Sequence, residues 1–140
     1  MAEEQKIPRP LPKPNTYMPT REFWDACHQG RLLLQYCKDS GKYQWYPRPV
    51  SLYTGKRNLE WREVKGTGTL YSWTVTFSAW PGHENRVPYI CAYVELDEGV
   101  RMLCNLLNCE AAELHMGMRV HLVWERLSDQ FNYPAFEPVR

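Results

Sequence analysis

The chain has 140 residues, of which 44% are hydrophobic, and this suits one domain or one small domain with an appendage. Lys and Arg total 17 against 16 Asp and Glu, so a formal charge of +1 gives no strong field for gathering nucleic acid. The five cysteines are odd in number and scattered through strand-like segments, which favours reduced thiols in a cytoplasmic protein over a disulfide framework.

Residues 1–19 are expected to form an extended arm, because five prolines in this segment exclude a helix. The residues after Met1 lack the apolar run of a signal peptide. No stretch approaches the roughly 20 apolar residues that cross a bilayer. We therefore expect a soluble protein with no membrane partner.

A short helix is predicted to begin after Thr20 and to end at Gly30, with Phe23 and Trp24 on its apolar face. The segments 31–37 and 43–46 then have the character of two hairpin arms joined by a tight turn.

Two turns in this region have the spacing of a zinc ribbon but not its ligands. The ligand positions hold Cys37, Ser40, Ser51 and Thr54, and a glycine follows each pair, at Gly41 and Gly55. Zinc needs about four sulfur or imidazole donors in a tetrahedron, and a neutral hydroxyl is a poor ligand for it. We predict that the ribbon binds no zinc and that the chain holds no tightly bound cofactor.

A ribbon without its ion needs other contacts, because a structural zinc contributes on the order of 10 kcal/mol to a small finger. Burying one large side chain contributes roughly 1.5 to 3 kcal/mol. We therefore predict that an aromatic cluster in the ribbon is buried, partly by a partner. Its members are Tyr36, Tyr43, Trp45, Tyr46 and Tyr53.

After Gly55 the pattern changes to longer strands rich in aromatic and β-branched residues. Strands are predicted over 60–64, 68–77, 89–96, 100–106 and 119–126, with a single helical turn at 109–114. Five strands with one short helical insert fit a small OB-fold barrel. The expected fold is mainly β: an arm over 1–19, a helix and metal-free ribbon over 20–59, and a five-stranded OB-fold over 60–140.

A set of short motifs runs in a fixed order along almost the whole of this layout. It comprises Phe23-Trp24, Cys37 with Gly41, Tyr46-Pro47-Arg48, Gly55, 66–74, Pro88-Tyr89, 94–99, 117–120 and Pro134-Ala135-Phe136. In this order the motifs resemble the DUF35 family, small proteins that join a rubredoxin-like zinc ribbon to an OB-fold. The resemblance implies a subunit that docks on a thiolase-like catalytic subunit and helps to shape the channel for CoA. An acyl-CoA thioester would be the shared substrate.

Two groups of residues are candidates for contact with CoA or with the partner. The loop from Trp80 to Tyr89 carries an aromatic residue, a glycine and Arg86, and such residues can stack on a base and bind phosphate. An ordinary loop anchored by aromatic residues explains it equally well. Lys56, Arg57 and Lys65, with Arg62 between them in the sequence, form a basic cluster that could face a phosphate or simply be solvated.

The sequence contains no convincing catalytic arrangement, which favours a non-catalytic subunit of a thiolase-type complex that cleaves or forms a C–C bond in an acyl-CoA. His83 and Glu84 could act as an acid–base pair, and a cysteine such as Cys37 could be a nucleophile. A solvated loop and a buried thiol explain them more simply. Two alternatives stay open: an independent acyl-CoA thioesterase, and a module that binds single-stranded nucleic acid, which the near-neutral charge disfavours.

Overall fold

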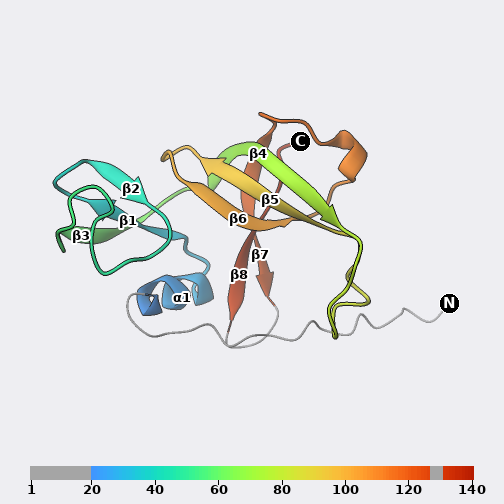
Figure 1. Ribbon diagram of the computed structural model, residues 1–140, viewed down its shortest axis with the longest axis horizontal. Coiled ribbons are helices and arrows are strands. Elements are labelled where there is room, and N and C mark those ends of the chain that lie inside the picture. The colour runs from blue at the N-terminus through green and yellow to red at the C-terminus, as the bar shows by residue number, and fades with distance from the viewer. Residues whose placement is uncertain (1–19, 127–130) are drawn as a thin grey trace.

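The computed structural model describes residues 20–126 and 131–140, so the arm expected over residues 1–19 lies outside the described part. A three-stranded sheet forms one end of the molecule and a closed five-stranded barrel forms the other, with the helix beside their junction (Figure 1). The predicted fold, mainly β with a ribbon ahead of a barrel, is confirmed. No helix in the described residues is long and apolar enough to cross a membrane.

The ribbon sheet has β1 (Leu33–Cys37) at its centre, between β2 (Lys42–Gln44) and β3 (Leu59–Glu63), and both pairs are antiparallel. The predicted hairpin is therefore confirmed. The strand expected at 60–64 exists, but its assignment to the barrel is wrong. It pairs with β1 along its whole length, from Leu33 opposite Glu63 to Cys37 opposite Leu59.

The barrel closes in the order β4-β5-β6-β8-β7. Its strands are β4 (Thr67–Thr76), β5 (Tyr89–Leu96), β6 (Arg101–Leu106), β7 (Arg119–Arg126) and β8 (Asn132–Pro138). A 3₁₀ turn, η1 (Ala111–Glu113), lies between β6 and β7 and confirms the predicted helical turn.

The fifth barrel strand, β8, was not predicted, because Pro134 and Pro138 argue against a strand. The structure accommodates both prolines. Strand β8 pairs with β7 along its length but with β6 only through Leu106 and Phe136, so Pro134 need not donate a hydrogen bond to β6.

Glycine is required where β4 enters the barrel. A Cβ atom at Gly66, which has a φ of +74°, would lie 2.5 Å from Leu122 Cβ. A Cβ atom at Gly68 would lie 2.4 Å from the backbone oxygen of Glu95. The two glycines let β4 pass close to β7 and β5 so that the barrel can close.

Helix α1 (Arg21–His28) connects the ribbon to the barrel. Its residues Phe23 and Cys27 are buried in a core that continues into the barrel around Phe136. On the other side, the Trp24 ring meets Tyr133 of β8 edge-on at 5.5 Å. The ribbon is thus attached to the barrel through one continuous apolar core.

Candidate functional site

Three of the four former ligand positions come together in the ribbon. Ser51 Oγ donates to Cys37 Sγ at 3.0 Å, which joins the second turn to the first. The same oxygen accepts the backbone N–H groups of Tyr53 and Thr54 at 3.1 and 3.3 Å. Ser40 Oγ is buried close to this sulfur. The hydroxyls of Ser40 and Ser51 lower the pKa of the Cys37 thiol to about 7.

These donors do not fit a zinc ion. The four positions supply one sulfur and three neutral hydroxyls, whereas structural zinc takes four thiolate or imidazole donors. The Thr54 hydroxyl already accepts the backbone N–H of Lys56 at 3.2 Å. Across residues 20–126 and 131–140, no group of three or more His, Cys, Asp or Glu side chains could hold a metal ion.

Two buried glutamines hold the segment between the two turns. Gln35 and Gln44 are 4% and 1% exposed and lie opposite each other on β1 and β2. Gln44 Nε2 donates to Gln35 Oε1 at 2.8 Å. Gln35 bonds both backbone groups of Arg48 at 2.8 Å, and Gln44 Oε1 accepts Leu52 N–H at 2.7 Å. Gln44 Nε2 also donates to the backbone oxygen of Val50 at 3.2 Å. We call this pair the glutamine clamp.

The predicted aromatic cluster divides into an inner and an outer part. Tyr43 and Trp45 pack against the main core, and Trp45 lies 4.8 Å from the Phe23 ring. Tyr46 and Tyr53 are 48% and 44% exposed on this chain. Burial within the chain therefore accounts for only part of the cluster, and the outer part is open to a partner.

Tyr36 of the same cluster is half-buried between two neighbours. Its ring meets Tyr43 edge-on at 5.0 Å, and the Arg62 guanidinium lies over the ring, 3.5 Å from its centroid. Arg62 is also paired with Glu60, so its charge is already engaged within the ribbon.

The loop between β4 and β5 is fastened to β7. Arg86 forms an ion pair with Glu125, whose side chain is 13% exposed. Arg86 N–H also donates to the His83 backbone oxygen at 2.9 Å, which forms a turn within the loop. The Arg86 guanidinium is therefore shared with a carboxylate. Trp80 of the same loop is 79% exposed.

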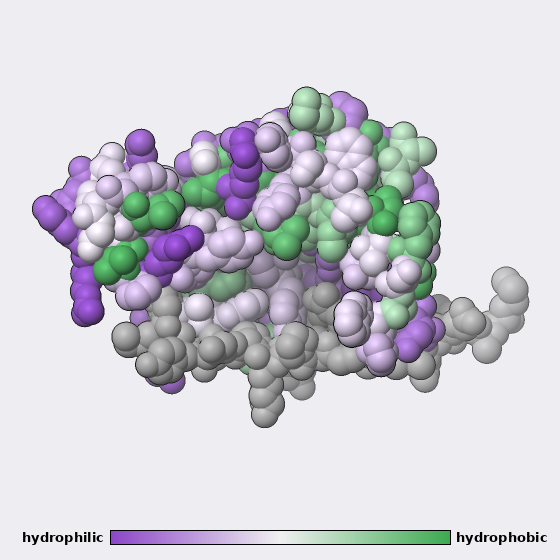
Figure 2. Space-filling view, viewed as in Figure 1, coloured by the Kyte–Doolittle hydropathy of each residue, from purple (hydrophilic) through white to green (hydrophobic). Residues whose placement is uncertain are grey.

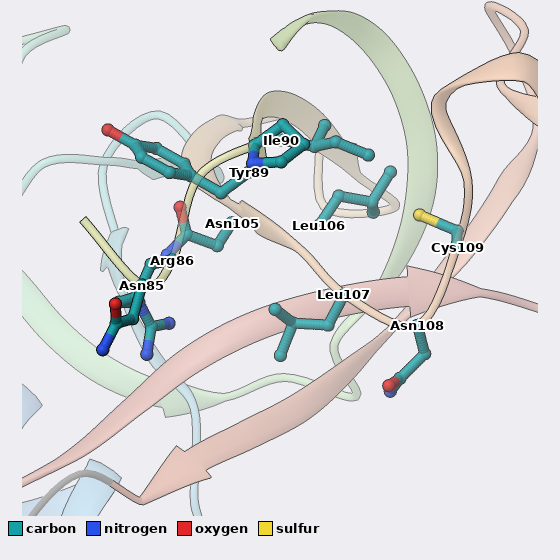
Figure 3. Close-up of a pocket in the computed structure, with 10 residues that line it drawn as sticks. Asn85, Arg86, Tyr89, Ile90, Asn105, Leu106, Leu107, Asn108 and Cys109 are labelled. Carbon is teal, nitrogen blue, oxygen red and sulfur yellow. The ribbon is translucent and has the colours of Figure 1, made fainter. Parts of the chain in front are cut away.

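A cavity of about 230 Å³ lies between the end of this loop and the segment after β6 (Figure 3). Its lining includes Arg86 and Tyr89, which the sequence singled out, but not Trp80. The lining combines amide and apolar side chains, comprising Asn85, Arg86, Pro88, Tyr89, Ile90, Asn105, Leu106, Leu107, Asn108 and Cys109. In Figure 3, Asn85 and Arg86 lie at one side of the site, and Asn108 and Cys109 at the other.

The basic residues predicted to act together are separated. Lys56 and Arg57 are exposed on the second ribbon turn. Lys65 follows β3 and lies near the acidic turn at 97–98, where its charge helps to lower the pKa of the first of these carboxyls. The five-residue strand β3 stands between the two groups.

Cys37, whose thiol has a lowered pKa, is fully buried, where a substrate could not reach its sulfur. Burial raises the pKa values of the Cys27 and Cys104 thiols to about 12, which keeps them protonated. Cys104 Sγ donates to the Ala92 backbone oxygen at 3.6 Å. Cys91 Sγ is directed toward Asn105 Oδ1 at 3.9 Å. No hydrogen bond joins a cysteine to a histidine among these residues.

Models of two ChsH2 domains match parts of this chain. The model of the rubredoxin-like zinc ribbon domain matches residues 24–50, and the model of the C-terminal OB-fold domain matches residues 61–125. A DUF35 domain-containing scaffold protein of Methanocaldococcus jannaschii is 30% identical over 95 residues, which cover 66% of this chain and 67% of that protein. The chain belongs to the DUF35 family.

This DUF35 chain is also similar to a chain of a solved structure and to part of a longer protein. A chain in a solved structure described as Ltp2-ChsH2(DUF35) aldolase is 29% identical with a TM-score of 0.82, over 90% of this chain and 98% of that one. A Thermomonospora curvata protein named probable enoyl-CoA hydratase alpha subunit is 30% identical over 135 residues, or 96% of this chain. The chain spans 42% of the length of that relative.

Sequence reasoning missed the glutamine clamp and the asparagines of the cavity. A signal for the clamp was present, because strand alternation places Gln35 on the same face as Leu33 and Cys37, where a polar side chain needs a buried partner. The asparagines gave no comparable signal. Asn105 and Asn108 lie at the end of β6, and only the tertiary fold brings them to the same cavity as Asn85.

Proposed function

We propose that this DUF35 chain is a non-catalytic subunit of a thiolase-type complex that cleaves or forms a C–C bond in an acyl-CoA thioester. The observation that carries the proposal is the match, at a TM-score of 0.82, to nearly all of a DUF35 chain from a structure described as an aldolase. The full burial of Cys37, the thiol with a lowered pKa, also supports a non-catalytic role.

The exposed apolar side chains support a docking role. Tyr71, Tyr93 and Leu103 lie on neighbouring strands β4, β5 and β6 and are 41%, 42% and 51% exposed. Phe77 and Trp80, in the loop between β4 and β5, are 75% and 79% exposed. Hydrophobic and pale aromatic residues share this face of the barrel with scattered hydrophilic ones (Figure 2). Large exposed aromatic residues of this kind are typical of surfaces that bind another protein.

Co-expression with a thiolase-like protein tests the proposal. The two chains are expected to co-purify, with acyl-CoA turnover only from the pair. A Trp80→Ala and Phe77→Ala double variant should weaken the association. Leu52→Ala, a change at an exposed apolar side chain of the ribbon, separates a barrel interface from a ribbon interface. Full turnover by the larger protein alone, with no stable association, would remove the proposal. Turnover by this chain alone would replace it with the thioesterase reading.

We further propose that the asparagine-lined cavity contacts the acyl-CoA. An acyl-CoA carries amide groups along a flexible arm, and the amides of Asn85, Asn105 and Asn108 offer both donors and acceptors beside apolar side chains. Because the Arg86 guanidinium is already paired with the Glu125 carboxylate, it is better suited to a neutral amide than to a phosphate.

An Asn105→Ala change in the assembled complex is expected to raise KM for the acyl-CoA by about 2- to 10-fold, the effect of losing one hydrogen bond. Asn58→Ala is the matched control, because the Asn58 side chain lies on the ribbon, away from the cavity, and donates to the exposed Asp39 carboxylate at 2.9 Å. An unchanged KM with intact assembly would exclude this cavity as a contact site.

A further inference from the structure

We propose that the glutamine clamp has taken over the structural role of zinc, so that this ribbon folds without a metal ion. The proposal concerns the fold of the ribbon and stands whether or not the chain serves a thiolase-like partner. It starts from the mismatch between the family's zinc ribbon and the donors present here, one thiol and three hydroxyls.

In a zinc ribbon the ion joins two turns that are distant in sequence. Here hydrogen bonds make the same connection. Gln35 and Gln44 lie on the β1–β2 hairpin, next to the first turn. Their side chains bond to the backbone of the segment that leads into the second turn, at Arg48, Val50 and Leu52. The hairpin side and the second turn are thus held together without any ligand.

The second turn is completed by backbone and hydroxyl groups. Ser51 N–H donates to the Lys56 oxygen at 2.7 Å and Gly55 N–H donates to the Ser51 oxygen at 2.9 Å. Ser51 Oγ accepts N–H groups from the residues after it while donating to Cys37. A serine oxygen thereby accepts the turn's N–H groups and links the two turns.

The clamp is specific to glutamine because both ends of each carboxamide are used. Gln35 Oε1 accepts from Gln44 Nε2 and from Arg48 N–H, while Gln35 Nε2 donates to the Arg48 oxygen. Gln44 donates to Val50 and accepts from Leu52. Both side chains are almost fully buried, where an unpaired amide is costly. A carboxylate would lose the donors and a hydrophobic residue would lose every bond.

Amide hydrogen exchange in the full chain tests the clamp directly. The N–H groups of Arg48 and Leu52 are expected to exchange slowly in the unaltered protein, because each donates to a buried glutamine oxygen. Gln44→Ala should speed exchange at Leu52 at least tenfold, while Gln29→Ala, the same change at an exposed position, leaves it unaltered. Fast exchange at Leu52 in the unaltered protein, or no response to Gln44→Ala, would overturn the proposal. The first of these readings needs no variant to fold.

A compensation experiment tests whether clamp and ion do the same job. A variant carrying Ser40→Cys, Ser51→Cys and Thr54→Cys, together with Cys37, restores the ligand spacing and is expected to bind one zinc ion. In its zinc-loaded form, Gln44→Ala should disturb Leu52 exchange several-fold less than in the unaltered chain. Failure to bind zinc would show that the clamp does not hold the turns in a metal-binding arrangement. An undiminished effect of Gln44→Ala would show that the clamp and the ion are not equivalent. Either result contradicts the proposal.

Discussion

The barrel and the ribbon are stabilised in different ways. The interior of the barrel is apolar, with Leu70, Val94, Val120 and Phe136 no more than 1% exposed. At the centre of the ribbon lie two carboxamides, a thiol and a hydroxyl joined by hydrogen bonds. Apolar packing depends on volume and tolerates exchange among similar side chains, whereas a buried polar network depends on every partner being present.

This difference predicts where the molecule tolerates change. A barrel position should respond to lost volume, and a ribbon position should respond to a lost donor or acceptor even when the volume change is small.

Phe136→Ala is expected to lower the free energy of unfolding by about 3 to 5 kcal/mol, because the ring is fully buried in the barrel core. Urea denaturation followed by tryptophan fluorescence measures the change. Phe77→Ala is the matched control, since the same truncation at a 75% exposed side chain should stay within about 0.5 kcal/mol. Equal losses for the two variants would mean that the barrel is not the apolar core described here.

Ser51→Ala removes only one oxygen from the ribbon but should lower the free energy of unfolding by about 1 to 3 kcal/mol. The change strips Cys37 of a donor and leaves the N–H groups of Tyr53 and Thr54 without their acceptor. Thr54→Ala, which loses one exposed bond to Lys56 N–H, should cost less than half as much. Urea denaturation measures both changes. Equal losses in the free energy of unfolding for the two variants would show that the hydrogen bonds of Ser51 do not stabilise the ribbon.

Asp97→Asn is expected to have the smallest effect, within the range of up to about 1 kcal/mol typical of exposed ion pairs. The Arg119 guanidinium and the Thr67 hydroxyl lower the pKa of Asp97 to about 2, below its ordinary 3.8. Because the folded-state pKa is the lower one, this stabilisation is present above about pH 4 and is lost as the pH falls toward 2. The variant should lose part of that pH dependence, measured as Tm between pH 2 and 5, and an unchanged pH dependence would contradict the assignment.

The strands that sequence reasoning placed correctly are those in which side-chain pattern alone decides the structure. The alternation in 89–96 and 101–106 and the turn between them are local features, and the structure has them as predicted. The sheet to which 59–63 belongs depends on its pairing with β1, a contact between segments far apart in sequence. Strand β8 was missed because its prolines argue against a strand and are accommodated here only since β8 pairs with β6 at a single position.

The site could be predicted in outline but not in its contacts. Spacing identified the two ribbon turns and the loss of zinc donors, since these follow from residue identity. The partner of Arg86 could not be foreseen, because Glu125 is 39 residues away on another strand. The clamp likewise depends on the register that sets Gln35 opposite Gln44. Long-range polar pairing is the part that a single sequence leaves open.

The most direct test of a ribbon held by hydrogen bonds is to measure the metal content of the purified full chain together with its Tm in the presence and absence of a chelator. Expressed with added zinc, the chain is expected to carry far less than one zinc ion per molecule and to have the same Tm with and without EDTA. One tightly held zinc ion per chain, with a Tm that falls when it is removed, would contradict the account.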